Sequence, residues 1–78
     1  MRLLVVEDDV ELASGLVSSL AQSGYAADTA HNARDAMAAC AATNYSLVIL
    51  DLGLPDLDGL ELLRRLRLES LKAPVLST

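Results

Sequence analysis

Acidic side chains follow two apolar runs in this sequence. The run from Leu3 to Val6 leads directly into Glu7 and Asp8, and the run from Leu47 to Leu50 leads into Asp51. Carboxylates gathered in one place repel each other, so the pKa of one of them rises unless a cation is bound. Mg²⁺ commonly takes one or two carboxylates, several waters and a phosphate oxygen. If the two runs lie side by side, these three acids form a candidate magnesium site.

An aspartate beside a cation can also attack a phosphoryl group, because the cation offsets the charge that otherwise repels a phosphate. Taken singly, each acid also fits a helix cap or a turn, and such caps are common. The shared position after apolar runs favours a site for Glu7, Asp8 and Asp51. We interpret Asp9 and Asp58 as N-caps and Asp56 as a turn residue.

The acids can meet only if the apolar runs are neighbouring parallel strands. Strands are predicted at residues 3–6, 25–30, 46–51 and 74–77, and helices at 10–20, 33–42 and after Asp58. Asn32 is a plausible cap for the second helix, and Gly24 a plausible residue just past the first. Alternating strands and helices indicate βαβ units, and continuous apolar runs indicate strands covered on both faces. The pattern predicts an α/β fold with its ligand edge at the carboxyl ends of the strands.

Composition limits the classes of function. The 78 residues allow one small domain, and a net charge of −5 argues against nucleic-acid binding by this chain. Cys40 is the single cysteine, so neither a disulfide framework nor a Cys/His zinc pattern is present. The N-terminal apolar stretch is too short for a signal peptide or a membrane span. We therefore expect a cytoplasmic protein without membrane contact, and a surface position for the lone His31.

Two classes of phosphate-handling enzyme fit poorly. The sequence has no Gly-x-x-x-x-Gly-Lys-Ser/Thr loop, so it is not a P-loop nucleotide hydrolase. Phosphohydrolases of the haloacid dehalogenase type need a second acid two residues after the nucleophile, and Gly53 stands there. We expect that the chain is not an enzyme.

The segments VVEDD at 5–9 and VILDLGLPDLDG at 48–59 resemble the receiver domain of two-component response regulators. They are most similar to the subfamily that carries a C-terminal winged-helix DNA-binding domain. The resemblance implies a flavodoxin-like, three-layer fold with a parallel sheet. It implies that Asp51 is the phosphoacceptor for a histidine kinase. It also implies that Glu7, Asp8, Asp51 and the backbone carbonyl of Gly53 hold Mg²⁺.

The sequence departs from the family pattern at its end. Residues 1–78 are expected to be an incomplete receiver domain, without the family's fourth helix, fifth strand and fifth helix. The phosphate-contacting lysine and the switch aromatic of the family fall in that part. Thr78 is either the family's switch residue one place out of register or part of an ending foreign to the domain.

These departures leave two functions open. The chain is a phosphoacceptor module, or it is a truncated receiver without phosphotransfer that acts only in protein association. An uncovered face on the first and third strands, together with a bare edge on the fourth, is expected to favour association. We therefore expect a homodimer or a swapped oligomer.

Overall fold

A computed structural model describes residues 1–69 and 71–77 of the chain. Thr78, the candidate switch residue, lies outside the described residues. Strands and helices alternate in the order β1 (Arg2–Val6), α1 (Val10–Gln22), β2 (Ala26–Ala30), α2 (Ala33–Ala42), β3 (Leu47–Leu50), α3 (Gly59–Leu68) and β4 (Val75–Ser77). The predicted elements are confirmed, with bounds that differ by one or two residues.

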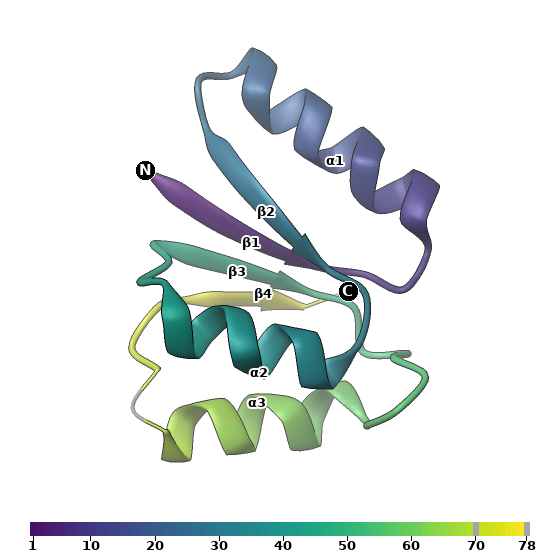
Figure 1. The fold of residues 1–78 in the computed structure, drawn as a ribbon, viewed down its shortest axis with the longest axis vertical. Coiled ribbons are helices and arrows are strands. Elements are labelled where there is room, and N and C mark those ends of the chain that lie inside the picture. Colours follow the sequence, from purple (N-terminus) through teal and green to yellow (C-terminus); the bar gives the residue numbers. More distant parts are fainter. Residues whose placement is uncertain (70, 78) are drawn as a thin grey trace.

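The strands form one sheet in the order β2-β1-β3-β4, and every pair is parallel. In the central pair, Leu3 lies opposite Leu47 and Val6 opposite Leu50, so β1 and β3 end level with each other. Helix α1 lies on one face of the sheet, while α2 and α3 lie side by side on the other (Figure 1). This confirms the predicted three-layer α/β fold and its parallel sheet.

Polar side chains define the start of each helix. Asp9 accepts a hydrogen bond from the Leu12 N–H at 3.1 Å, and Asn32 accepts one from the Asp35 N–H at 2.8 Å. Asp58 caps α3 through the Leu60 N–H at 2.9 Å. Such bonds satisfy amides that have no partner inside the helix. All three predicted N-caps are therefore confirmed.

The core lies between the sheet and the α2–α3 layer. Leu4 and Val6 of β1 and Val48 and Leu50 of β3 point to this side and are fully or almost fully buried. They meet the apolar side of α3 and a stripe of alanines on α2. Burying such a side chain contributes about 1.5–3 kcal/mol, so these strand residues fix β1 beside β3.

The opposite face is only partly covered. Leu3 and Val5 of β1 are buried at 2% and 0% exposure, so the prediction of an uncovered first strand is wrong. The reason is that α1 packs across β1 as well as β2. On β3, Ile49 is partly buried, and beside it on the edge strand β4 Leu76 is 59% exposed. The uncovered apolar surface thus begins at β3.

Among the described residues, no helix has both the length and the apolar character that crossing a membrane requires.

Candidate metal centre

Backbone hydrogen bonds carry the sheet geometry past the ends of its central strands. The N–H of Glu7 donates to the carbonyl oxygen of Ala30, and the N–H of Asp51 donates to that of Val6, each at 2.9 Å. The residues that directly follow β1 and β3 are therefore still held as sheet residues. Their positions depend on strand pairing, which the buried core stabilises.

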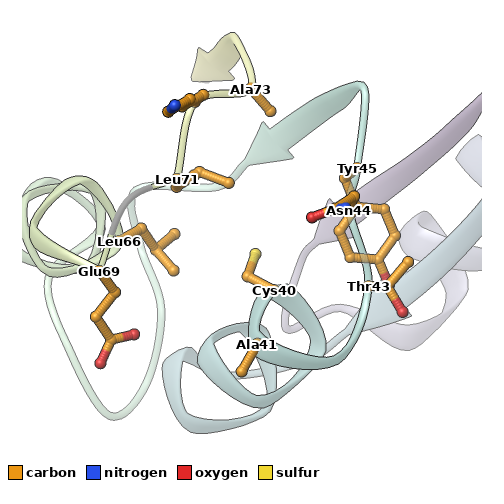
Figure 2. Close-up of a pocket in the computed structure, with 10 residues that line it drawn as sticks. Cys40, Ala41, Thr43, Asn44, Tyr45, Leu66, Glu69, Leu71 and Ala73 are labelled. Carbon is orange, nitrogen blue, oxygen red and sulfur yellow. The ribbon is translucent and has the colours of Figure 1, made fainter.

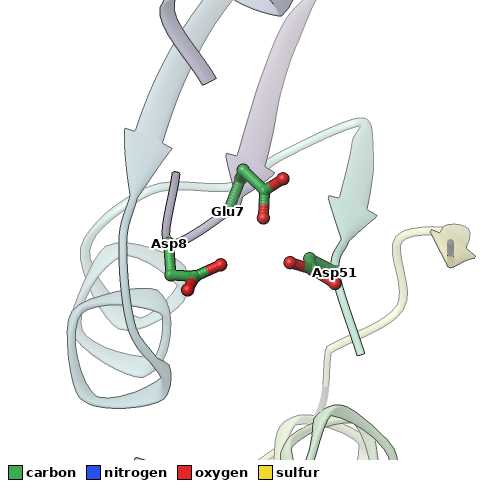
Figure 3. Close-up of side chains that lie close together, drawn as sticks. All are labelled: Glu7, Asp8 and Asp51. Carbon is green, nitrogen blue, oxygen red and sulfur yellow. The ribbon is translucent and has the colours of Figure 1, made fainter. Parts of the chain in front are cut away.

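Three carboxylates meet at this edge of the sheet. Glu7, Asp8 and Asp51 each offer one oxygen, and these oxygens all lie within 4.8 Å of one another. The three side chains point into a common space (Figure 3). Glu7 is buried, Asp51 is partly buried and Asp8 is exposed, so the cluster opens to solvent on the side of Asp8. The convergence that the sequence predicted is present.

In the part of the chain that the structure describes, the buried acid Glu7 lacks a partner for one of its carboxylate oxygens. Within the described residues, the Oε2 atom of Glu7 is buried without a hydrogen-bond partner. The close contact with the Asp51 carboxylate, burial, and the negative charges of Asp51 and Asp8 raise the pKa of Glu7 to about 7. The contact with Glu7 and the N–H of Gly53 lower the pKa of Asp51 below its usual value. A buried carboxylate in this position calls for a proton or a cation.

The donor set fits a hard divalent cation. Mg²⁺ prefers oxygen ligands, keeps several waters, and is held in proteins by few carboxylates. One buried, one partly buried and one exposed carboxylate provide protein ligands on one side and room for water on the other. The unpartnered Oε2 atom of Glu7 fits the same role.

The loop between β3 and α3 is folded tightly against the site. The N–H of Gly53 donates to Oδ1 of Asp51 at 3.0 Å, and the N–H of Gly59 donates to the Leu52 carbonyl at 3.2 Å. A Cβ on Gly59 would lie 2.6 Å from the Cα of Leu52, which is closer than real side chains approach. Gly59 is therefore required for the chain to pass this close to itself.

Two contacts around the site were not predicted from the sequence. Asp56, predicted to be a turn residue, accepts hydrogen bonds from the N–H groups of Ala33 at 2.8 Å and Arg34 at 3.2 Å. His31 is partly buried, not a free surface residue, and its Nδ1 lies 2.9 Å from the carbonyl oxygen of Glu7. A carbonyl only accepts, so Nδ1 carries the proton. These partners are 22 to 24 residues apart in sequence, so no local pattern could reveal them.

A separate cavity of about 680 Å³ opens at the amino ends of β3 and β4, away from the acids. Figure 2 shows the Cys40 side chain pointing from α2 into the space between Leu66 and Tyr45. Burial raises the pKa of this thiol, which disfavours the reactive thiolate. None of the three clustered acids lines this cavity.

The fold is a parallel α/β domain with a cluster of three acids at the carboxyl ends of its central strands. Residues 3–78 match the response regulator receiver domain, and the chain belongs to this family. The resemblance inferred from VVEDD and VILDLGLPDLDG is thereby confirmed.

Similar proteins are regulators of transcription by name. The chain is 54% identical over 76 residues to transcriptional regulatory protein PmrA of Pectobacterium parmentieri, covering 97% of this chain and 34% of PmrA. It is 49% identical to transcriptional regulatory protein BasR of Escherichia coli strain K12, with the same coverage. The chain thus spans about a third of the length of these relatives.

Solved structures agree with this family. The response regulator protein TrrA from Thermotoga maritima, in complex with Mg²⁺-BeF, matches with a TM-score of 0.88 and 36% identity, over 95% of this chain and 64% of TrrA. A two-component response regulator from Clostridium difficile matches with a TM-score of 0.94 and 25% identity, over 99% and 63%.

Proposed function

We propose that this chain is a phosphoacceptor module in which Asp51 receives a phosphoryl group from a histidine kinase. Glu7, Asp8, Asp51 and the backbone carbonyl of Gly53 would hold Mg²⁺ there. The observation that carries the proposal is the set of three carboxylate oxygens within 4.8 Å of one another at the carboxyl ends of β1 and β3. That the similar protein TrrA was solved with Mg²⁺-BeF supports the same assignment.

The residues at this edge suit nucleophilic attack on phosphorus. The lowered pKa of Asp51 keeps its carboxylate ionised at neutral pH, and the Gly53 N–H fixes its rotation by holding Oδ1. A carboxylate oxygen forms the new O–P bond while the N–P bond of the donor phosphohistidine breaks. The bonding electrons and a proton from solvent go to the imidazole nitrogen, and an acyl phosphate is the product. When bound, Mg²⁺ supplies positive charge that offsets repulsion between carboxylate and phosphate.

We propose that the chain is a substrate of the kinase and not an enzyme itself. Residues 1–78 match over 64% of the solved TrrA chain. In a longer protein, the phosphorylation state of Asp51 would control an output that regulates transcription, as in the transcriptional regulatory proteins PmrA and BasR by their names. The net charge of −5 supports a regulatory role for this part, with nucleic acid bound elsewhere.

The experiment is intact-mass spectrometry after incubation with acetyl phosphate and Mg²⁺, beside Asp51→Asn. We expect the wild-type chain to gain one phosphoryl group, and the gain to be absent in the variant and in chelator. A gain that persists in Asp51→Asn would contradict the assignment of the phosphoacceptor. If the wild-type chain gains no phosphoryl group, the proposal that it is a phosphoacceptor is wrong.

We also propose that the chain associates with a second copy of itself. Among the described residues β4 is an edge strand of the sheet, and Leu76 on β4 and Leu12 on α1 are 59% and 52% exposed. Bare edges and apolar patches both promote pairing. Light scattering coupled to size exclusion should show a dimer at micromolar concentration that Leu76→Lys weakens. A compact wild-type monomer would contradict this.

A further inference from the structure

Asp56 reaches out of the β3–α3 loop to the beginning of another helix. Its Oδ1 accepts the N–H of Ala33 at 2.8 Å, and its Oδ2 accepts the N–H of Arg34 at 3.2 Å. These are the first two amides of α2, which have no acceptor inside their own helix. The hydrogen bond from Ala33, followed by the one from Arg34, lowers the pKa of Asp56, so the carboxylate is charged at neutral pH. Charge-assisted bonds of this kind are stronger than those between neutral groups.

The segment that Asp56 holds is also the segment that holds Glu7. The Ala30 carbonyl accepts the N–H of Glu7, and Nδ1–H of His31 donates to the carbonyl of Glu7, each at 2.9 Å. Residues 30–34 thus contact one proposed metal ligand directly. Through Asp56 they also contact the loop that carries another, Gly53.

Hydrogen bonds and the chain itself form a closed ring that includes Glu7 and Asp51. From Glu7 the ring passes through residues 30–34 to Asp56, back along the loop to Asp51, and across the sheet to Val6, which precedes Glu7. Among the hydrogen bonds of the described residues, only those of the Asp56 side chain connect the β3–α3 loop to the start of α2. Removing that side chain opens the ring at one place.

Helix α2 has a cap of its own, so the bonds from Asp56 do more than start this helix. The Asn32 side chain accepts the Asp35 N–H at 2.8 Å, and the Asn32 carbonyl accepts the Ala36 N–H at 3.1 Å. Asp56 is exposed, and water can replace its oxygens at the Ala33 and Arg34 amides. Water cannot replace the connection to the loop.

We infer that Asp56 is a positioning residue for the metal centre: by clamping the β3–α3 loop to the start of α2, it sets the backbone of Gly53 relative to Glu7 and Asp51. This inference rests on the proposed function. Residues that orient metal ligands without touching the metal commonly change metal affinity strongly when they are replaced.

The test compares Asp56→Ala with Asn32→Ala, which removes a different bond from the same helix start without touching the loop. Magnesium affinity is measured by titration calorimetry on the full chain. We expect Asp56→Ala to weaken Mg²⁺ binding by about tenfold, Asp56→Asn to lie between it and wild type, and Asn32→Ala to bind like wild type. Equal losses for both alanine variants would mean that Asp56 acts only through the stability of α2, and would overturn the inference.

A second measurement needs no metal. Hydrogen exchange of the Gly53 amide, which donates to Asp51, reports how firmly the loop is held. In chelator we expect Asp56→Ala to speed this exchange by about tenfold relative to Asn32→Ala. Unchanged exchange would overturn the positioning role. A wild-type chain that binds no Mg²⁺ but shows faster Gly53 exchange in Asp56→Ala would overturn the proposed metal site while leaving the clamp in place.

Discussion

The backbone N–H of Asp51 donates to the carbonyl oxygen of Val6 across 2.9 Å, one residue beyond the last paired position of β3. This bond places the candidate nucleophile next to the acid that follows Val6 on β1. The backbone of Asp51 is therefore held by the sheet, whereas Gly53 is held by the loop. Substitutions in the sheet should therefore affect the position of the Asp51 backbone, and substitutions in the loop should affect that of Gly53.

Glu7→Gln should stabilise the metal-free chain at neutral and higher pH. The folded-state pKa of Glu7 is raised from 4.5 to about 7, so the native state binds more protons than the unfolded state in this window. Stability therefore falls as pH rises through it. Glutamine has no charge to bury, and the gain should reach about 1–3 kcal/mol above pH ~7 and vanish below pH ~4.5.

Urea denaturation in chelator at several pH values measures this effect. The matched control is Glu11→Gln, because Glu11 is an exposed acid in the first turn of α1. Addition of Mg²⁺ should stabilise wild type but not Glu7→Gln, since the variant has lost a proposed ligand. A Glu7→Gln chain less stable than wild type at high pH would show that burying this charge has no cost.

Residue patterns predicted the local structure and the convergence of the acids well. Asp9, Asn32 and Asp58 were identifiable as caps because capping depends on residues two or three positions away. The acid cluster was identifiable because parallel strands bring their carboxyl ends to one edge.

Contacts between distant segments could not be predicted in this way. Asp56 looks like any turn aspartate, and its partner amides become its neighbours only when α2 and the β3–α3 loop pack together. The burial of β1 on its α1 side was also missed, because the lateral position of α1 over the sheet depends on packing that periodicity does not encode. Long-range packing, and not local propensity, decided both.

Gly59→Ala should destabilise the chain and disturb the loop. The added Cβ would lie 2.6 Å from the Leu52 Cα and 2.9 Å from its Cδ2, so backbone has to move. We expect a loss of about 1–3 kcal/mol, as for other overpacked sites, together with weaker Mg²⁺ binding. Gly15→Ala is the matched control: a Cβ there meets nothing within 4 Å, so helix propensity should give a gain of about 0.5–1 kcal/mol. Similar stabilities for the two variants would contradict the close approach.

Leu62→Ala should cost much more stability than Leu60→Ala on the same helix. Leu62 is 0% exposed in the hydrophobic core, whereas Leu60 is 62% exposed. Removing a buried leucine side chain typically costs about 2–5 kcal/mol, and the exposed one should cost less than about 0.5 kcal/mol. Thermal unfolding measures both. Equal losses would mean that α3 packs on the sheet by another face.

Asp28 should make stability depend on pH in the acid range. It lies on β2 between Arg2, whose Nη2 and Nε donate to it at 2.6 and 2.9 Å, and Tyr45, whose hydroxyl donates at 2.7 Å. The bonds from Arg2, followed by the one from Tyr45, lower its pKa below the usual 3.8. A carboxyl with a lowered folded-state pKa adds stability above its unfolded pKa, and this is lost as pH falls through the folded one.

Asp28→Asn should therefore reduce stability at neutral pH and have little effect once wild-type Asp28 is protonated. The Arg2 and Asp28 side chains are 50% and 33% exposed, so solvent screens the pair and the expected loss is about 1 kcal/mol. Tyr45→Phe should lose a similar amount, because it removes the buried hydroxyl's bond to the same carboxylate. Glu61→Gln breaks an exposed pair with Arg64 within α3 and should change stability less. If the difference in stability between Asp28→Asn and wild type is the same at low pH, the effect comes from packing and not from the charge of Asp28.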